Sequence, residues 1–296
     1  MKKALKIGMI LIVVGFLVFF AVLAFNGFNL TKIFKGDYQT NTYNINEDFN
    51  EISLIIDTAD VMLVKSQDGK CKIECYEKAD EKHIPTVENK SLTIKLEDNV
   101  KWYNSLFNFG NPKIKIYLPK LEYEALIVKA DTSDIELNTP MNFKSVNMEL
   151  STGDISLDGV ITNEIKLSVS TGDMELDNIN CNGNISLNCS TGDIEINNVN
   201  CKNLTSTGST GEISLDNLIA TEKIYIERST GDVEFDRMDA GEIFIETSTG
   251  DVEGSLLSEK IFIVETSTGK ERVPETTSGG KCKITTSTGD VFINIK

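Results

Sequence analysis

The chain has few of the residues on which enzyme active sites and nucleic-acid surfaces depend. Its 296 residues include one histidine, and 29 basic side chains stand against 45 acidic ones, giving a net charge of −16. The single histidine, His83, lies in a charged stretch beside Asp80, which predicts a solvated side chain rather than an acid–base catalyst. Phosphate backbones and anionic lipid headgroups both require basic surfaces. The composition therefore excludes nucleic acid as a partner and argues against tight binding to anionic lipid.

The six cysteines offer little opportunity for disulfides. Cys71 and Cys75 lie four residues apart in an alternating stretch, which separates them by about 13 Å along a strand and prevents a bridge. Cys181 and Cys201 are one sequence repeat apart. A disulfide between these two and a free, half-buried pair both stay open at this point.

One long apolar run stands near the N-terminus. Residues 7–25 carry no charge and follow a basic segment, 1–6. Their length suits a helix that crosses a bilayer, so the sequence predicts a cytoplasmic tail (1–6), a transmembrane helix (7–27) and a polar stalk (28–45). The rest of the chain would then lie outside the cell. Cleavage as a signal peptide after Val22-Leu23-Ala24 is the alternative.

A four-residue phrase, Ser-Thr-Gly-Asp or a close variant, returns every 19 or 20 residues over the second half of the chain. Earlier copies with Ala59 or Ser133 in place of glycine begin at Asp57 and Asp131. A fixed period of this length is typical of stacked repeat architectures. The phrase begins at Ser151, Ser170, Ser190, Ser209, Ser229, Ser248, Ser267 and Ser287.

Between the phrases, apolar residues alternate with polar ones, as in strands with one buried face, and no helical periodicity occurs. Two strands and two turns per repeat predict an all-β fold, a right-handed parallel β-solenoid of about nine coils with 19–20 residues each. Residues 46–125 would form an N-terminal β cap and the first coils, and 126–296 the repeat solenoid. The final strand, Val291–Lys296, is expected to leave an open edge on which another copy could pair.

Within the phrase, glycine is expected to turn a corner of each coil, and the hydroxyl and carboxylate side chains to bond nearby amides. The aspartate and a glutamate two residues later should point outward, forming acidic ladders. These ladders are interpreted either as a solvated face or as a weak Ca²⁺ strip, with no other cofactor expected. The carboxylates concerned are Asp173, Glu175, Asp193, Glu195, Asp232, Glu234, Asp251 and Glu253.

Catalysis is not expected, because a catalytic carboxylate pair is normally unique and here the pair recurs in many coils. Basic residues that could assist polysaccharide cleavage are few: Lys223, Arg228 and Arg237. An insertion over 99–112 is rich in aromatic side chains, which are candidates for partner contact or for covering the first coil. These residues are Trp102, Tyr103, Phe107 and Phe109.

Taken together, the repeated phrase, the strand Leu92-Thr93-Ile94-Lys95 and the stretch Ile116-Tyr117-Leu118-Pro119 resemble a bacterial putative-adhesin family still labelled a domain of unknown function. The resemblance covers about residues 45–296. It implies a membrane-anchored β-helix on the cell surface, often in Gram-positive bacteria and in some cases associated with the response to cell-envelope stress. It implies no catalytic residues.

The sequence and the resemblance lead to one expected function and two alternatives. We expect a surface interaction module that binds an extracellular protein or glycan. The alternatives are a self-assembling envelope scaffold that pairs through its open C-terminal coil, and an enzyme acting on polysaccharide.

Overall fold

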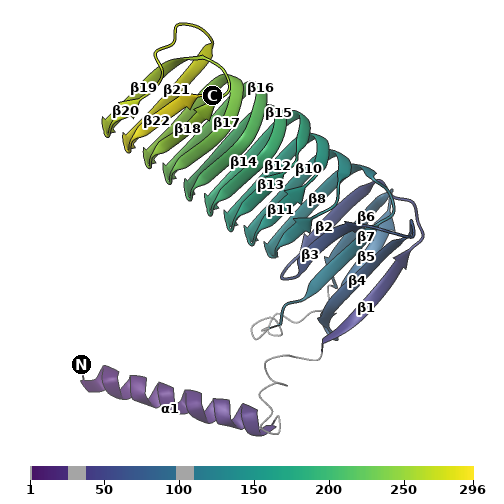
Figure 1. Cartoon of the computed structure of the whole chain (residues 1–296). Coiled ribbons are helices and arrows are strands. Elements are labelled where there is room, and N and C mark those ends of the chain that lie inside the picture. The colour runs from purple at the N-terminus through teal and green to yellow at the C-terminus, as the bar shows by residue number, and fades with distance from the viewer. Residues whose placement is uncertain (1, 26–37, 98–109) are drawn as a thin grey trace.

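The computed structural model describes residues 2–25, 38–97 and 110–296. These form one helix, α1 (Lys2–Phe25), and an elongated stack of strands (Figure 1). The strands of the N-terminal region are β1 (Tyr38–Ile45), β2 (Glu51–Ile56), β3 (Asp60–Lys65), β4 (Cys71–Lys78), β5 (His83–Glu88), β6 (Ser91–Leu96) and β7 (Lys113–Leu118).

The remaining strands build the regular part of the stack. They are β8 (Glu122–Thr132), β9 (Ile135–Leu137), β10 (Met141–Thr152), β11 (Ile155–Asp158), β12 (Val160–Thr171), β13 (Met174–Asp177), β14 (Asn180–Thr191), β15 (Ile194–Thr210), β16 (Ile213–Thr230), β17 (Val233–Thr249), β18 (Val252–Leu256), β19 (Lys260–Thr268), β20 (Glu271–Arg272), β21 (Gly280–Thr288) and β22 (Val291–Ile295).

Helix α1 stands apart from the strands in Figure 1. It begins inside the segment that was predicted to be a cytoplasmic tail and takes in most of the predicted transmembrane segment. Over the residues whose side chains the structure describes, no helix has the length and apolarity needed to cross a membrane. The prediction of a transmembrane helix over 7–27 is therefore not confirmed.

The predicted all-β, right-handed parallel solenoid of about nine turns is confirmed. Equivalent positions of successive repeats pair in register, so that Ile155 lies beside Met174, and Met174 beside Ile194. The inward side chains of the coils within the stack are almost completely buried and form one continuous core along it. Each coil alone would expose its apolar face, and stacking removes that face from water.

At two positions of the core, a glycine leaves room for a large side chain of an adjacent coil. Gly254 occupies an inward slot because the Phe235 ring of the adjacent coil fills that space; a β-carbon on Gly254 would lie 2.3 Å from the ring. Gly208 likewise makes room for Arg228, whose side chain is 2% exposed and donates to the carbonyl oxygen of Cys189 at 3.2 Å. Burial lowers the pKa of the Arg228 guanidinium.

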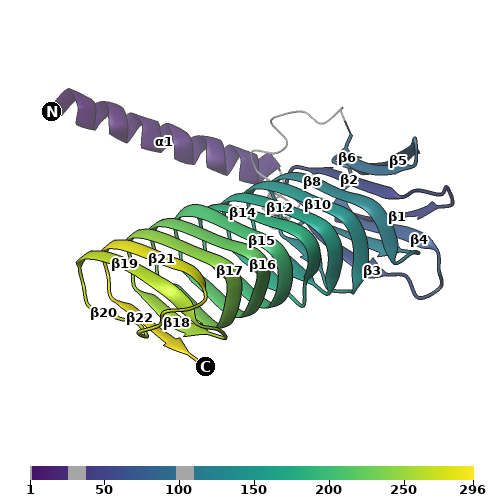
Figure 2. The ribbon, with the colours of Figure 1, turned by 90° about the horizontal axis from the view of Figure 1, so that it is seen from above.

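At the N-terminal end the spatial order of the coils departs from the chain order. The coil β2–β3 lies between β8–β9 and the outermost coil, β6–β7. Antiparallel strands then cover this outermost coil, with β5 on β6, β4 on β7, and β1 on β4 (Figure 2). Residues 38–45 are therefore a capping strand and not part of the predicted stalk, whose remainder, 28–37, lies outside the described residues.

The prediction of a solvated His83 is wrong. Its side chain is only 4% exposed and pairs through Nδ1 with the buried Glu77 carboxylate at 2.8 Å. Glu77 also accepts the backbone N–H of His83 at 2.7 Å and the side-chain amide of Asn41 at 2.7 Å. The charged residues around Asp80 conceal this burial in the sequence, and the pair ties β5 to β4 within the cap.

At the C-terminal end, too, the spatial order of the coils differs from their order in the chain. The last strands of the chain, β21 and β22, lie between the coil formed by β17–β18 and the coil formed by β19–β20. The prediction that Val291–Lys296 forms an open edge is therefore wrong, because β22 has a neighbour on each side. Among the described strands of this end, β19 and β20 carry the free edges.

All six cysteines are free and buried. The disulfide between Cys181 and Cys201 that the sequence left open is not formed. Burial raises the pKa of the Cys201 thiol to about 12, so these side chains behave as small core residues.

Candidate functional site

Each coil turns at two corners that require unusual backbone angles. At the first corner, the glycine of the repeated phrase has φ between +126° and +154° in seven copies. The stack imposes a second restriction, since a β-carbon on Gly192 would lie 2.0 Å from the carbonyl oxygen of Gly172 in the preceding coil. The predicted role of glycine is confirmed, and packing between coils adds to the backbone requirement.

The aspartate of the phrase joins neighbouring coils. The backbone N–H of Asp173 donates to Oδ1 of Asp154 at 2.8 Å, and that of Asp193 donates to Oδ1 of Asp173 at 2.8 Å. The same contact recurs in later coils, up to the last one, where the N–H of Lys270 donates to Asp290 at 2.7 Å. Every such carboxylate keeps one oxygen bound to backbone, which explains the recurrence of aspartate without invoking a metal.

The glutamates two residues later form an interrupted outward column. Glu175 lies beside Glu195, and Glu234 beside Glu253, but Ser214 separates the two pairs. Burial raises the pKa of Glu175, and the nearby carboxylates add to the effect. Across the described chain, no group of three or more acidic, histidine or cysteine side chains is arranged to hold a metal ion. The Ca²⁺ strip remains a prediction without a coordinating geometry.

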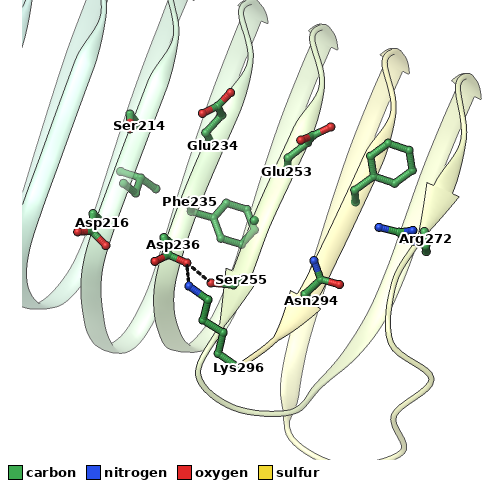
Figure 3. A pocket seen from close by; sticks show the side chains of 13 residues that line it. Ser214, Asp216, Glu234, Phe235, Asp236, Glu253, Ser255, Arg272, Asn294 and Lys296 are labelled. Carbon is green, nitrogen blue, oxygen red and sulfur yellow. Dashed lines mark hydrogen bonds and ion pairs between the residues drawn. The ribbon is translucent and has the colours of Figure 1, made fainter.

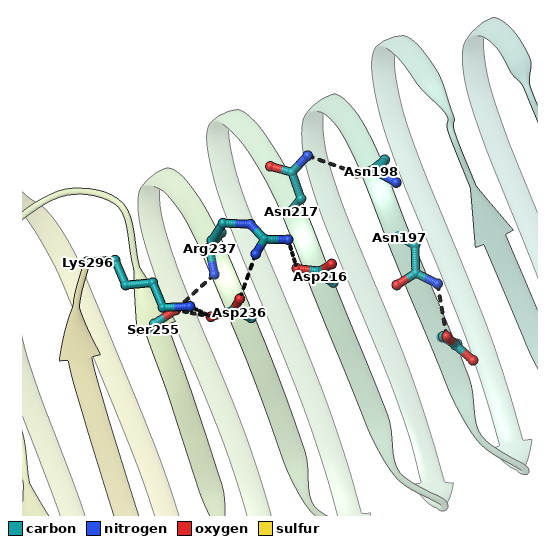
Figure 4. Close-up of polar contacts among 9 residues, drawn as sticks. Asn197, Asn198, Asp216, Asn217, Asp236, Arg237, Ser255 and Lys296 are labelled. Atoms are coloured by element: carbon teal, nitrogen blue, oxygen red, sulfur yellow. Dashed lines mark hydrogen bonds and ion pairs between the residues drawn. The ribbon is translucent and has the colours of Figure 1, made fainter.

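The second corner carries a left-handed residue that is not always glycine. Gly159 has φ +72°, and Asn178, Asn198 and Asn217 have φ between +54° and +56°. Asparagine tolerates this conformation, and the amide of Asn217 donates to that of Asn198 at 3.0 Å (Figure 4). Arg237 takes the same angle, φ +51°. An arginine strained in a position that suits asparagine points to a role beyond turning the chain.

Arg237 is the centre of a polar network (Figure 4). Its guanidinium donates to Asp216 at 2.5 Å and to Asp236 at 3.0 Å, and its backbone N–H donates to the hydroxyl of Ser255 at 3.0 Å. Asp236 also accepts hydrogen bonds from Lys296 and from Ser255. The bond from Lys296 is the main reason that the pKa of Asp236 lies below its usual range.

The network forms one side of a shallow surface groove of about 530 Å³, which we call the Asp236 groove (Figure 3). Two rows of side chains run along it, with Phe235 at its floor. The guanidinium of Arg272 lies 5.3 Å from the ring centre of Phe292. The lining residues are Ser214, Leu215, Asp216, Glu234, Phe235, Asp236, Glu253, Gly254, Ser255, Arg272, Phe292, Asn294 and Lys296.

The chain matches a known protein family. A family model described as Toastrack DUF4097 matches residues 49–294. The chain belongs to the Toastrack family. The match covers the coils and the cap apart from strand β1, and it agrees with the resemblance to putative adhesins found in the sequence.

Solved structures resemble this Toastrack chain in fold. A putative adhesin from Parabacteroides merdae is 15% identical with a TM-score of 0.59, and the match covers 88% of this chain and 98% of the other. A putative adhesin from Parabacteroides distasonis is also 15% identical, with a TM-score of 0.50 and coverage of 86% and 98%. No curated protein matches the sequence. Identities this low establish the shared architecture alone.

The structure brings together only some of the residues singled out in the Toastrack sequence. Glu234 and Glu253 line the Asp236 groove, whereas Asp232 and Asp251 belong to the backbone ladder. The basic trio separates: Arg228 is buried in the core, Lys223 lies against the aromatic ring of Phe244, and Arg237 sits at the second corner. The aromatic candidates Trp102, Tyr103, Phe107 and Phe109 lie outside the described residues.

Sequence reasoning missed Asp216, Asp236 and Asn294 as parts of the site. One available sign was the arginine at position 237, where the preceding coils have asparagine. The groove also depends on the insertion of β22 beside β18, which brings Asn294 next to Ser255. The order of the strands in space is not encoded in the repeat period.

Proposed function

We propose that this Toastrack chain is a surface interaction module, related in function to adhesins, that faces the outside of the cell. It binds its ligand in the Asp236 groove. The observation that carries the proposal is the pairing of a strained arginine with a groove at one end of a rigid rod. Residues in unfavourable backbone conformations cluster at functional sites, and Arg237 fixes Asp216 and Asp236 along the rim.

The chemistry of the rim favours a glycan. Glu234, Glu253 and Asn294 offer planar groups that can each bond two neighbouring hydroxyls. The Phe292 ring and the Arg272 guanidinium provide a flat surface beside them. The groove is open and shallow, which suits a segment of a polymer better than an enclosed small molecule. An extended glycan chain lying across the coils fits these properties.

We infer that the module binds its ligand without transforming it. The support is the distribution of the acidic pairs, which recur along the rod and do not single out one site. His83, the residue best suited to proton transfer, is buried in the cap with Glu77. A part in the response to envelope stress, as the resemblance implies, would be a further proposal that deletion of the protein under cell-wall stress would test.

Binding of the full chain to an array of bacterial glycans tests the proposed function. Asn294→Ala and Glu253→Gln, both in the groove, should reduce binding of any hit by about tenfold each, as expected for lost hydrogen bonds to a ligand. Glu175→Gln changes the same outward column two coils away from Ser214, at the edge of the groove, and should leave binding unchanged. Equal binding by all three variants would refute the groove as the site, and capture of proteins alone would replace the glycan by a protein ligand.

A further inference from the structure

The two ends of the solenoid protect their edge strands to different degrees. At the N-terminal end, the edge strand β5 contains Pro85, which has no N–H to offer, and the edge strand β1 is largely polar. At the C-terminal end, β19 reads KIFIVETST and has no proline. Ile261 and Ile263 on its outer face are 46% and 41% exposed. An apolar edge of this kind favours pairing with another strand.

The inner face of β19 is also incompletely covered. Phe262 and Val264 are partly buried against the core. Their partners in the next coil, Cys282 and Ile284, are 0% exposed. The last coil therefore exposes apolar surface that every coil within the stack conceals, and covering it would be favourable.

We propose that the β19 edges of two copies of the chain pair antiparallel around a twofold axis and join two solenoids end to end. The molecule itself provides a precedent, because the edge of β6 takes antiparallel β5 and the edge of β7 takes antiparallel β4. A twofold axis makes the interface self-complementary. With Ile263 opposite Ile263 of the partner subunit, Phe262 lies opposite Val264 of the partner subunit, and both side chains point inward.

The charged side chains around the outer face of β19 also fit the antiparallel pairing of two copies. Glu265 of one copy lies opposite Ile261 of the partner subunit, whose neighbour on β21 is Lys281 of the partner subunit. Within its own copy, Glu265 already lies 3.8 Å from Lys283. Each carboxylate thus falls between lysines, which matters for a chain whose net charge of −16 opposes association elsewhere.

The dimer does not depend on the proposed glycan, but it would affect how a glycan is held. Arg272 belongs to β20 in the last coil and lines the Asp236 groove. Joining the last coils would therefore place two grooves close to the junction. Two grooves acting on one polymer would raise its apparent affinity without any new contact.

Sedimentation of the full chain over a concentration series tests the dimer. The wild-type mass should double as concentration rises. Ile263→Lys places two like charges directly opposite each other across the axis and should weaken the dimer by about tenfold or more. Ile161→Lys is the matched control, because Ile161 is 45% exposed on a strand within the stack; this variant should dimerise as the wild type does.

Crosslinking supplies a positive test. Ile263→Cys should form a disulfide-linked dimer under mild oxidation, because the two copies of this position face each other, and the native cysteines are all buried. Leu257→Cys, which is exposed outside β19, should crosslink much more slowly. A wild-type chain that stays monomeric at every concentration, or an Ile263→Lys variant that is folded by circular dichroism and dimerises normally, would overturn the proposal.

Discussion

Both corners of a coil use a residue with positive φ, but different constraints decide which residue can stand there. At the phrase corner, the coils stack so closely that the carbonyl oxygen of one glycine fills the space where the next would carry a β-carbon. At the second corner, residues with φ from +51° to +72° include glycine, asparagine and arginine. Packing between coils dictates the residue at the first corner, whereas the backbone angle is the main restriction at the second.

Because of this difference, the two corners of a coil can serve different roles. From Ser151 onward the phrase corner always carries glycine, and only the earlier copies have Ala59 or Ser133 there, so its repetition reports the architecture. The second corner accepts side chains of different size, and there the chain places Arg237 with its contacts to Asp216 and Asp236. A position that tolerates variation within a rigid stack is where a repeat protein can acquire a binding site.

The largest expected effect comes from making one substitution at both corners. Gly192→Asn puts a β-carbon 2.0 Å from a backbone carbonyl at φ +142° and should lower the free energy of unfolding by more than about 3 kcal/mol. Gly159→Asn has φ +72° and puts a β-carbon 3.0 Å from the Pro140 ring and 3.1 Å from the Pro140 Cα, a milder contact that should cost about 1 kcal/mol or less. Urea denaturation measures both. Equal losses would contradict the distinction between the corners.

A smaller effect is expected from the carboxylate ladder of the phrase corner. Asp193→Ala removes the acceptor of the Glu212 N–H, now bonded at 2.8 Å, and should lower the free energy of unfolding by about 1 kcal/mol. Asp193→Asn retains an oxygen acceptor and serves as the control. If the alanine variant unfolds at the same urea concentration as the wild type, the ladder does not stabilise the stack.

Exchanging arginine and asparagine at the second corner should change the free energy of unfolding by a similar or smaller amount. Arg237→Asn restores the residue that earlier coils use and should raise the free energy of unfolding by up to about 1 kcal/mol, because exposed ion pairs contribute little in return. Asn217→Arg should lower it by a comparable amount. Glycan binding should weaken in Arg237→Asn and remain in Asn217→Arg. A less stable Arg237→Asn variant would show that the network stabilises the fold.

The smallest effect concerns pH. Burial raises the pKa of Glu212, with neighbouring carboxylates adding to the shift, so its ionised form opposes folding and stability should rise as pH falls from 7 through that pKa. The pKa of Asp236 is lowered by its hydrogen bonds. Its stabilising contribution is present above about pH 4 and is lost as pH falls through the lowered value.

A thermal melt series from pH 7 to pH 3 should therefore pass through a maximum at mildly acidic pH. Glu212→Gln should raise the melting temperature at pH 7 and have little effect near pH 4. A profile for this variant that is parallel to that of the wild type would rule out the raised pKa of Glu212 as the cause of the maximum.

Much of the fold could be predicted because the period places like residues on like positions. The columns of Ile155, Met174 and Ile194, and the glycines of the phrase, follow directly from counting. The order of the coils at the ends could not be predicted, because β21 pairs as well with β17 as with β19, and alternation does not distinguish the two neighbours.

The candidate site was harder to predict for the same reason. Asn294 reaches the Asp236 groove only through the insertion of β22 beside β18. The burial of His83 depends on Glu77, which lies six residues away on another strand and supplies the buried charge partner. The aspartate ladder was visible as a repeat, but its bonds to backbone N–H groups arise from the spacing between coils.

The position of β22 inside the stack has a mechanical consequence. A chain pulled from Lys296 does not peel away an outer turn, because β22 is bonded to β18 on one side and to β20 on the other. Force applied there must shear two sets of hydrogen bonds at once, or first displace the outermost turn, β19–β20. If the Asp236 groove binds a ligand as proposed, the insertion of β22 between two coils would resist unfolding of this end of the solenoid under a pulling force.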